Sequence, residues 1–220
     1  EYFIENFIAT GASIHHDGEK IYITGMNIYP YLPAMIVLDN NFTSETKVTP
    51  SGFSYQEGSY ASQVLVSSDG ETGYLIFYAY NESGDNRLQK YVWRFSTETN
   101  QFIGEALQFG GGDHIGSIHS ARMSSDGNKL FISDYNRPEI SVLNLSNFEV
   151  EDVIDLTTIN EDFDDIKALD VVGDRVYLGI EDLEGYSYFV VLDSQDYSVD
   201  SILQLDEGVY VESMTATDTQ

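Results

Sequence analysis

The sequence predicts an all-β fold built from four copies of one antiparallel unit, and three observations carry this prediction. A turn that contains glycine returns at intervals of roughly 50 residues, which is typical of large structural repeats. An aromatic residue stands five positions after the start of every turn. No segment shows the apolar period of about 3.6 residues, with caps, that a helix requires. The turns and their aromatics are Asp17-Gly18 with Tyr22, Asp69-Gly70 with Tyr74, Asp126-Gly127 with Phe131, and Val172-Gly173 with Tyr177.

Each turn is expected to be the tip of a hairpin, because glycine accepts a positive φ angle and aspartate tolerates the left-handed region. A strand of small residues precedes each tip, the aromatic strand follows it, and two further runs complete the unit. The units span residues 11–50, 60–109, 117–156 and 166–205. Small residues on the innermost strand and bulky aromatics packing between units are typical of four-stranded blades, so the fold class is a β-propeller.

The repeated unit resembles a known repeat, and the resemblance covers most of the chain. The segment from Ser124 to Ser133, together with Val142-Leu143-Asn144, is similar to the repeat of YVTN-type propellers, which has a Ser-Pro-Asp-Gly turn and a later Val-aliphatic-Asp strand. This chain has Ser or His in place of the proline, and it lacks the aspartate at Val172. The resemblance implies a propeller architecture. The group includes lactonase-like enzymes, surface-layer proteins and redox-enzyme subunits, so function stays open.

The two ends do not complete a ring of four blades. Residues 2–8 are interpreted as a spare outer strand, and residues 209–220 as the start of a further unit, with an inner strand from Val209 to Thr217. We therefore expect residues 1–220 to form a section of a larger propeller of about seven blades. The alternative is a single closed domain in which the terminal strands have other roles.

Composition bounds the setting and the partners. Asp and Glu total 37 against 10 Lys and Arg, a formal net charge of −27, which excludes a nucleic-acid-binding surface. No apolar stretch approaches the roughly 18 residues of a membrane span, so no membrane insertion is expected. Cysteine is absent, which excludes disulfides and thiol catalysis. The abundance of Tyr and other polar residues in a β-repeat favours an extracellular, cell-surface or periplasmic location.

The most suggestive local chemistry lies in residues 110–122, which join the second unit to the third. In a propeller this crossing enters the central channel, the usual ligand site. His114, His119 and Arg122 are therefore candidate catalytic residues, and Asp113 is a candidate metal ligand beside them. The alternative interpretation is a glycine-rich loop whose polar residues only line the channel.

An acidic run before the fourth unit offers a second candidate site. Its carboxylates at Asp162, Asp164 and Asp165 are candidate ligands for Ca²⁺, the one cofactor that the sequence suggests. No Asp-x-Asp-x-Asp-Gly loop accompanies them, and a solvated charge run is the alternative. His15-His16, at the first tip, is interpreted as a pair of turn residues because neighbours on a strand point to opposite faces.

These observations favour a non-enzymatic binding or structural propeller of an exported or cell-surface protein, which contacts a protein or small-molecule ligand with one face. Nucleophile-elbow, zinc-protease and phosphate-loop motifs are absent from the sequence. Two alternatives stay open. One is a lactonase-like, metal-dependent hydrolase with its site in the central channel, and the other is the propeller subunit of a redox enzyme.

Overall fold

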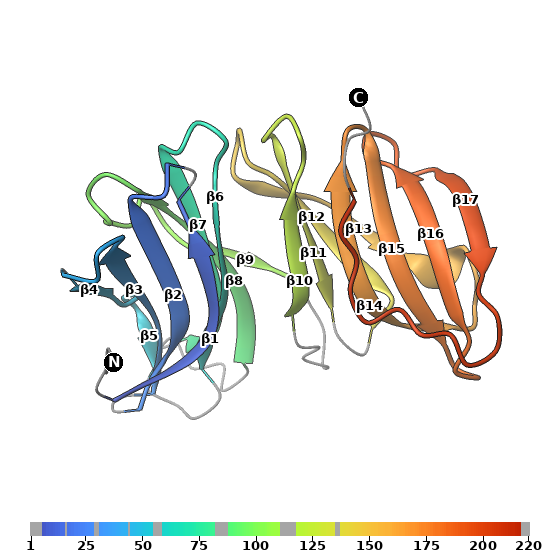
Figure 1. Ribbon diagram of the computed structural model, residues 1–220, viewed down its shortest axis with the longest axis horizontal. Coiled ribbons are helices and arrows are strands. Elements are labelled where there is room, and N and C mark those ends of the chain that lie inside the picture. The colour runs from blue at the N-terminus through green and yellow to red at the C-terminus, as the bar shows by residue number, and fades with distance from the viewer. Residues whose placement is uncertain are drawn as a thin grey trace. The chain divides into compact units, whose positions relative to one another are not determined.

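The computed structural model describes residues 6–15, 17–28, 31–43, 45–54, 59–81, 88–110, 118–134 and 137–216. Within these residues the chain is β-structure, with one short 3-10 helix, η1 (Leu156–Thr158), and no helix that is long and apolar enough to cross a membrane. The strands form four antiparallel sheets, here called blades 1 to 4 (Figure 1). The chain divides into two compact units, Glu1–Ile115 with blades 1 and 2, and Gly116–Gln220 with blades 3 and 4.

In every blade the strands pair with their neighbours in chain order, so each blade is an antiparallel meander. Blade 1 is β1 (Phe7–Ile14), β2 (Lys20–Asn27), β3 (Leu32–Asp39) and β4 (Glu45–Val48); blade 2 is β6 (Tyr60–Val66), β7 (Thr72–Asn81), β8 (Leu88–Ser96) and β9 (Leu107–Phe109), with β5 (Phe53–Ser54) added beside β7. Blade 3 is β10 (Ile118–Met123), β11 (Lys129–Asp134), β12 (Glu139–Asn144) and β13 (Glu149–Asp155); blade 4 is β14 (Phe163–Val172), β15 (Arg175–Asp182), β16 (Ser187–Asp193) and β17 (Val199–Gln204). The prediction of four antiparallel, four-stranded blades is confirmed.

The predicted terminal strands differ from the structure. Phe7 and Ile8 belong to the inner strand β1, where they pair with Asn27 and Met26 of β2, so the interpretation of these two residues as part of an outer strand is wrong. Residues 2–5 of the predicted strand lie outside the described residues. Residues 205–216 contain no assigned strand. They pack on blade 4 nevertheless, because a Cβ atom placed on Gly179 would lie only 2.4 Å from Val211.

The geometry of the hairpin tips explains the repeated turn sequence and its one departure, in blade 4. In blades 1 to 3 the tip is closed by a backbone bond between residues five apart, such as Ser124 N to Lys129 O at 2.9 Å. In blade 4, Val172 pairs directly with Arg175, so only two residues form the turn. Val172 therefore corresponds to Ser124 and not to Asp126. This shorter turn accounts for the aspartate that the fourth repeat lacks.

A β-bulge recurs at one position of every inner strand, which the sequence did not predict. The bulged residues are Thr10, Ser62, His119 and Lys167, each of which lies five positions before the residue that closes the hairpin. These four side chains have little chemistry in common, so the bulge depends on the geometry of the blade.

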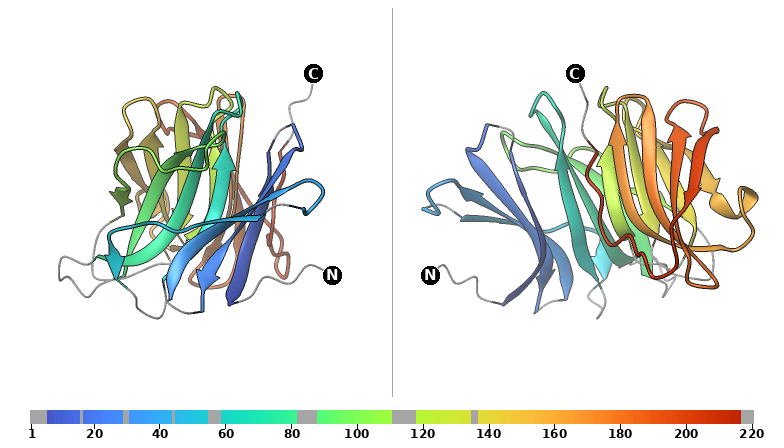
Figure 2. Two further views of the ribbon diagram at one scale, coloured as in Figure 1. Left: turned by 90° about the vertical axis from the view of Figure 1, so that its left-hand side faces the viewer. Right: turned by 45° about the vertical axis from the view of Figure 1, so that its right-hand side comes forward.

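The core of each unit lies between its two blades. In unit 1, Tyr22 of blade 1 is fully buried against Phe95 of blade 2, with an edge-on ring contact at 5.6 Å. In unit 2, Phe131 of blade 3 is buried with Leu178 of blade 4. The views in Figure 2 show the sheets of blades 1 and 2 side by side, in blue and in green. The predicted packing of the repeat aromatics between blades holds at Tyr22 and Phe131. Tyr177 is only half-buried, and its ring stacks on Phe189 of its own blade.

Candidate functional site

His119, a predicted catalytic residue, is the bulged residue of β10 and is exposed. Its Nε2 atom lies 2.6 Å from the carbonyl oxygen of Lys167 in β14, so this nitrogen carries the hydrogen and donates it. The bulged Thr10 of blade 1 likewise donates from Oγ1 to a carbonyl of blade 2, that of Ala61. The side chain at the bulge therefore ties one blade to the next within both units. His119 has a structural contact at one ring nitrogen.

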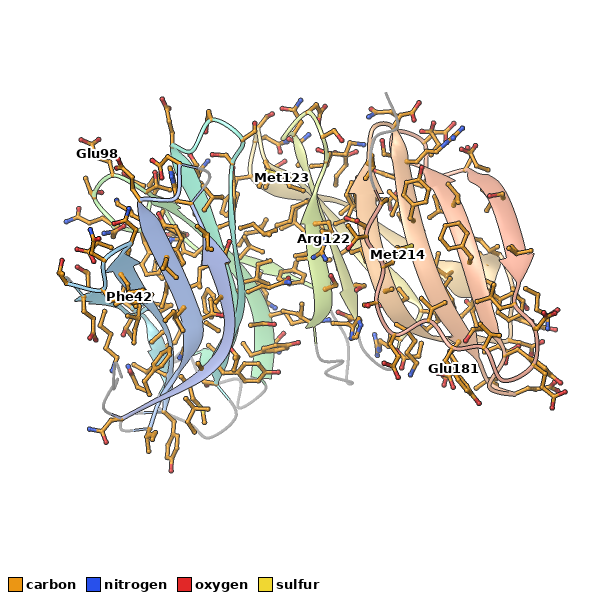
Figure 3. All side chains as sticks on the ribbon, viewed as in Figure 1. Phe42, Glu98, Arg122, Met123, Glu181 and Met214 are labelled. Carbon is orange, nitrogen blue, oxygen red and sulfur yellow. The ribbon has the colours of Figure 1, made fainter. Side chains whose placement is uncertain are left out.

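Arg122 lies three residues after His119 on β10, and its side chain also bonds to blade 4. Its Nε donates to Asp170 in blade 4 at 3.3 Å, and its Nη1 donates to Ser120 Oγ at 3.1 Å. The other carboxylate oxygen of Asp170 accepts a 2.6 Å bond from the backbone N–H of Ala216. Arg122 and Asp170 therefore link blade 3, blade 4 and the segment 205–216. Figure 3 shows Arg122 on its strand and Met214 on that segment.

The predicted calcium ligands are dispersed. Asp165 is buried, and it accepts a 2.6 Å bond from the ammonium of Lys167, which also pairs with Glu181 at 3.1 Å. The bond to Asp165 raises the pKa of Lys167 above its usual range. Asp162 and Asp164 are exposed. Among the residues that the structure describes, no group of three or more His, Asp or Glu side chains could hold a metal ion.

Two of the predicted site residues, Asp113 and His114, lie outside the described residues. Around the remaining ones, two small hollows of about 340 and 110 Å³ follow the segment 210–214. His119, Lys167 and Glu212 line both hollows. The structure thus gathers His119, Arg122 and Lys167 near one surface, but it does not bring Asp162 or Asp164 to that surface.

A larger hollow of about 680 Å³ lies in unit 1, between the hairpin tips of blades 1 and 2, and we call it the tip notch. Its carboxylates come from both tips and from the turn between β8 and β9; they are Asp17, Glu19, Asp69, Glu71 and Glu98. Only His15 and Lys20 supply positive charge among its lining residues. Glu98 can be seen in Figure 3 on the upper left of unit 1. The notch is therefore strongly acidic.

His15 closes the first hairpin, where blades 2 and 3 have serine, and it lies in the notch wall with 8% of its surface exposed. Its Nε2 is 2.9 Å from the carbonyl oxygen of Gly70, and its Nδ1 is 2.6 Å from a carboxylate oxygen of Asp17. The bond to Gly70 and the partner Asp17 raise the pKa of His15, although burial opposes them. The interpretation of His15 as a turn residue is correct, but this residue also connects two blades.

Lys20 also lines the notch. Its ammonium donates to the main-chain carbonyls of Thr97 and of Glu98, in the turn between β8 and β9 of blade 2. Lys129 occupies the same position in blade 3 and donates to the carbonyl of Ser194 in blade 4 at 3.2 Å. A lysine at this repeat position therefore joins the two blades of each unit. This role was not predicted from the sequence, although lysine recurs two residues before the repeat aromatic, at Lys20 before Tyr22 and at Lys129 before Phe131.

Comparisons with known proteins support the fold. No protein-family profile and no curated protein matches the sequence. Solved structures similar to this chain include a hypothetical selenium-binding protein from Sulfolobus tokodaii (11% identity, TM-score 0.65, 90% of this chain and 55% of that one). Others are the periplasmic gluconolactonase of Pseudomonas aeruginosa (12%, 0.55, 90% and 53%) and the β-propeller domain of the trilobed protease from Pyrococcus furiosus (12%, 0.54, 95% and 61%).

These neighbours are β-propeller proteins, so the blades described above have a β-propeller architecture. The chain spans only 53% to 61% of the length of these three structures. At such low identity the likeness shows the fold alone, and membership of the YVTN family stays a prediction.

Proposed function

We propose that this chain is a non-enzymatic binding β-propeller, from an exported or cell-surface protein, which holds a positively charged partner at the hairpin tips of unit 1. The observation that carries the proposal is the tip notch. It is a hollow of about 680 Å³, within the range of about 300–1,000 Å³ typical of ligand sites, and carboxylates from two blades converge on it.

The state of the other candidate residues supports the same choice. A hydrolase in the central channel would depend on His119 and Arg122, and both side chains hold blade 4 against blade 3. The carboxylates of Glu19, Glu71 and Glu98 are exposed at the rim of the notch instead. Because the chain carries a net charge of −27, long-range attraction favours a basic partner.

The proposal is tested with a fluorescently labelled oligolysine peptide, whose binding is followed by anisotropy. Replacing three rim carboxylates together, in the variant Glu19→Gln/Glu71→Gln/Glu98→Gln, should weaken binding by about tenfold, since each lost charge contributes a few tenths to about 1 kcal/mol. The matched control neutralises three exposed carboxylates of unit 2, in the variant Glu149→Gln/Glu184→Gln/Glu207→Gln. The control removes the same net charge and should weaken binding by less than about twofold.

Two results would contradict the proposal. Equal weakening by both triple variants would show that the peptide senses only the total charge. Turnover of a lactone by the purified protein, abolished by His119→Ala, would show that the chain is an enzyme.

A further inference from the structure

The segment 211–216 has the apolar spacing of an inner strand, although no strand is assigned to it. In blades 2 and 4 the inner strand packs on the preceding blade with the residue before its bulge and with the residues two and four positions after the bulge. These residues are Ala61, Val64 and Val66 in β6, and Ile166, Leu169 and Val171 in β14. The half-buried residues of the segment repeat this spacing around the exposed Glu212, and they are Val211, Met214 and Ala216.

The segment also lies where an inner strand next to blade 4 would lie. Val211 packs over Gly179, because a Cβ atom placed on that glycine would overlap its side chain. The backbone N–H of Ala216 bonds to the carboxylate of Asp170 at 2.6 Å. Asp170 pairs with Tyr177 across the sheet, and Gly179 stands two residues after Tyr177, so all three point to one face of blade 4. This far face is turned away from the core that blades 3 and 4 share.

The bulge position supports the same placement. In blades 3 and 4 the bulged residues of the two inner strands are neighbours, since His119 Nε2 is 2.6 Å from the carbonyl oxygen of Lys167. Lys167 in turn lines two hollows together with Glu212, which stands at the bulge position of the segment. Figure 3 shows Met214 on the segment where it crosses blade 4.

The backbone of the segment is unpaired. Each of the four inner strands pairs with the second strand of its own blade. Among the residues that the structure describes, no backbone hydrogen bond joins residues 210–215 to another part of the chain. A row of unpaired N–H and C=O groups is a template on which another strand can pair.

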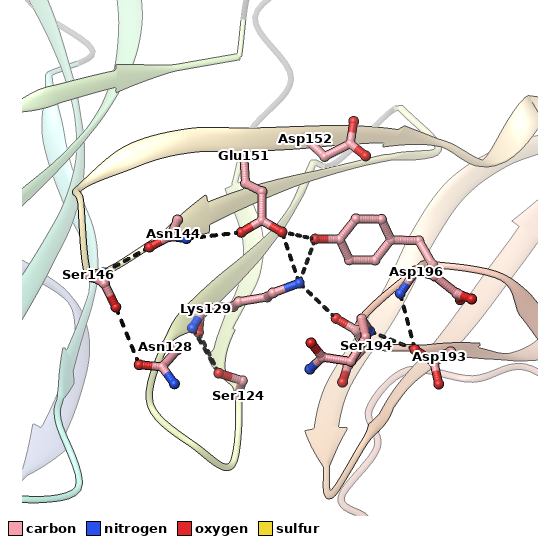
Figure 4. A network of polar contacts seen from close by, with 12 residues as sticks. Ser124, Asn128, Lys129, Asn144, Ser146, Glu151, Asp152, Asp193, Ser194 and Asp196 are labelled. Carbon is pink, nitrogen blue, oxygen red and sulfur yellow. Dashed lines mark hydrogen bonds and ion pairs between the residues drawn. The ribbon is translucent and has the colours of Figure 1, made fainter.

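Blade 3 shows how the equivalent face is covered when a further blade packs on it. The ammonium of Lys129 bonds to the carbonyl of Ser194 at 3.2 Å and to the hydroxyl of Tyr197 at 2.9 Å, and both partners belong to blade 4 (Figure 4). The ring of Phe131 meets the ring of Tyr197 edge-on at 6.4 Å. A basic residue and an aromatic on this face therefore join blade 3 to blade 4.

The far face of blade 4 carries the same two features. Arg175 and Tyr177 stand at the positions of Lys129 and Phe131, in the same strand of the repeat. The side chain of Arg175 is 53% exposed, and the half-buried ring of Tyr177 stacks on the half-buried ring of Phe189. The features that join one blade to the next thus recur on a face with exposed apolar surface.

The repeat and the charge of the chain indicate the kind of strand that fits. In blade 4 the aliphatic residues on either side of the repeat aromatic, Val176 and Leu178, are fully buried in the core shared with blade 3. A basic residue begins the second strand in three of the four blades, at Lys20, Lys129 and Arg175. A basic strand also suits the net charge of −27, whereas two copies of this chain would repel each other.

We propose that the segment 211–216 and the far face of blade 4 bind a β-strand of a partner protein. The strand pairs with the backbone of the segment and packs alternate aliphatic side chains on Tyr177 and Phe189. Its sequence is a basic residue followed by aliphatic, aromatic and aliphatic residues. This surface lies within unit 2, so it does not depend on the tip notch.

The test is a titration of the isotopically labelled protein with short peptides, followed by the amide signals in NMR spectra. The probe, acetyl-Lys-Leu-Phe-Ile-Ser-amide, copies the start of β11. One comparison peptide has serine in place of Leu and Ile, and the other has proline in place of Phe and lacks one N–H donor. We expect saturable shifts centred on residues 211–216 with the probe, and binding weaker by about tenfold or more with both comparison peptides. No saturable shifts with the probe, or equal affinity for all three peptides, would overturn the inference.

The first variant removes the packing that holds the segment on blade 4. Val211→Asp should weaken binding of the probe by about tenfold or more, since Val211 no longer packs over Gly179. The matched control is Val209→Asp, at a valine of the same segment that is 47% exposed, and it should change affinity by less than about twofold. Equal effects of the two substitutions would show that only the added charge matters and would overturn the inference.

A second variant tests the backbone pairing without a change of charge. Thr215→Pro removes an N–H from the unpaired stretch and should weaken binding of the probe by about fivefold or more. The control is Glu207→Pro, which precedes Gly208 with φ of 83° in a turn that accepts proline, and it should have less than about a twofold effect. Undiminished binding by both Val211→Asp and Thr215→Pro would overturn the inference.

The mass of the protein in solution separates a partner protein from a second copy of this chain. We expect light scattering to give the monomer mass of 24.7 kDa in the absence of the probe. A dimer that Val211→Asp dissociates would show that a second copy occupies the surface, and the assignment to a partner protein would be wrong.

Discussion

The two units use one repeat position in different ways. In unit 2, Lys129 is covered by Tyr197 and paired with Glu151, so the junction of blades 3 and 4 is closed by side chains. In unit 1, Lys20 bonds to main-chain carbonyls of blade 2, the turn residue that corresponds to Tyr197 is Asn100, which has no ring, and a hollow lies between the tips. The lysine therefore joins the two blades in both units, whereas the left-handed residue of the turn between the third and fourth strands differs, since it is Asn100 in blade 2 and Tyr197 in blade 4.

The two units also differ in whether their carboxylates are paired within the protein or exposed to solvent. Glu151 is satisfied by Lys129 and by the hydroxyl of Tyr197, and the bond from Lys129 lowers the pKa of this carboxyl. The carboxylates at the rim of the tip notch are exposed and face a hollow. Charged residues at equivalent places in a repeat thus have different roles, and the packing around them distinguishes these roles.

The largest expected effect comes from opening the notch of unit 2. Tyr197→Asn copies Asn100 on a backbone that tolerates asparagine, but it removes the ring from Phe131 and from Lys129. We expect a loss of about 2–3 kcal/mol in the free energy of unfolding, measured by urea denaturation with circular dichroism. Tyr210→Asn, at a tyrosine that is 65% exposed, is the control and should cost less than about 0.5 kcal/mol. Equal losses would show that Tyr197 does not close the junction.

A smaller difference is expected between the two lysines. Lys129→Met breaks a partly buried ion pair and leaves Glu151 with one donor fewer, so we expect a cost of about 2 kcal/mol. Lys20→Met removes only bonds to carbonyls and should cost about 1 kcal/mol. Trp93, the single tryptophan of the chain, lies in β8 and reports on unit 1 by its fluorescence. A larger loss for Lys20→Met than for Lys129→Met would reverse the comparison.

The smallest expected effect is a pH dependence confined to unit 1. Because the folded pKa of His15 is raised above its value of about 6.5 in an unfolded chain, its contribution to stability is fully present below about pH 6.5. That contribution is lost as the pH rises through the folded pKa. The variant His15→Ser copies the closing serine of blades 2 and 3 and should remove this dependence. Parallel pH profiles of the two proteins, followed by Trp93 fluorescence, would contradict the assigned role of His15.

Local chemistry made most of the fold predictable. Asp-Gly pairs specify tips through positive φ at Gly18, Gly70 and Gly127, and these tips fix the register of the strands on either side. The fourth tip has a shorter turn, because Gly173-Asp174 forms a two-residue hairpin that the repeat pattern does not distinguish. The bulges at Thr10 and at the three equivalent positions have no local signature, so the sequence could not reveal them.

The site was less predictable because its residues acquire their roles from the neighbouring blade. His119 looked chemically active in its loop, but its partner is the carbonyl of Lys167, which lies 48 residues further along the chain. The tip notch is lined by residues of two blades, from Asp17 of the first tip to Glu98 of the turn between β8 and β9, and the sequence of a single blade gives no sign of it.

The measurement that tests the central claim most directly is the map of amide signals, in NMR spectra, that move when the oligolysine peptide is added to the unmodified protein. We predict that the largest changes lie at the tip notch, in Gly70, Thr97 and Glu98, which are among the residues that line it. Changes centred instead on Ser120, Lys167 and Glu212 would place binding at the inner strands of unit 2, and they would contradict the account.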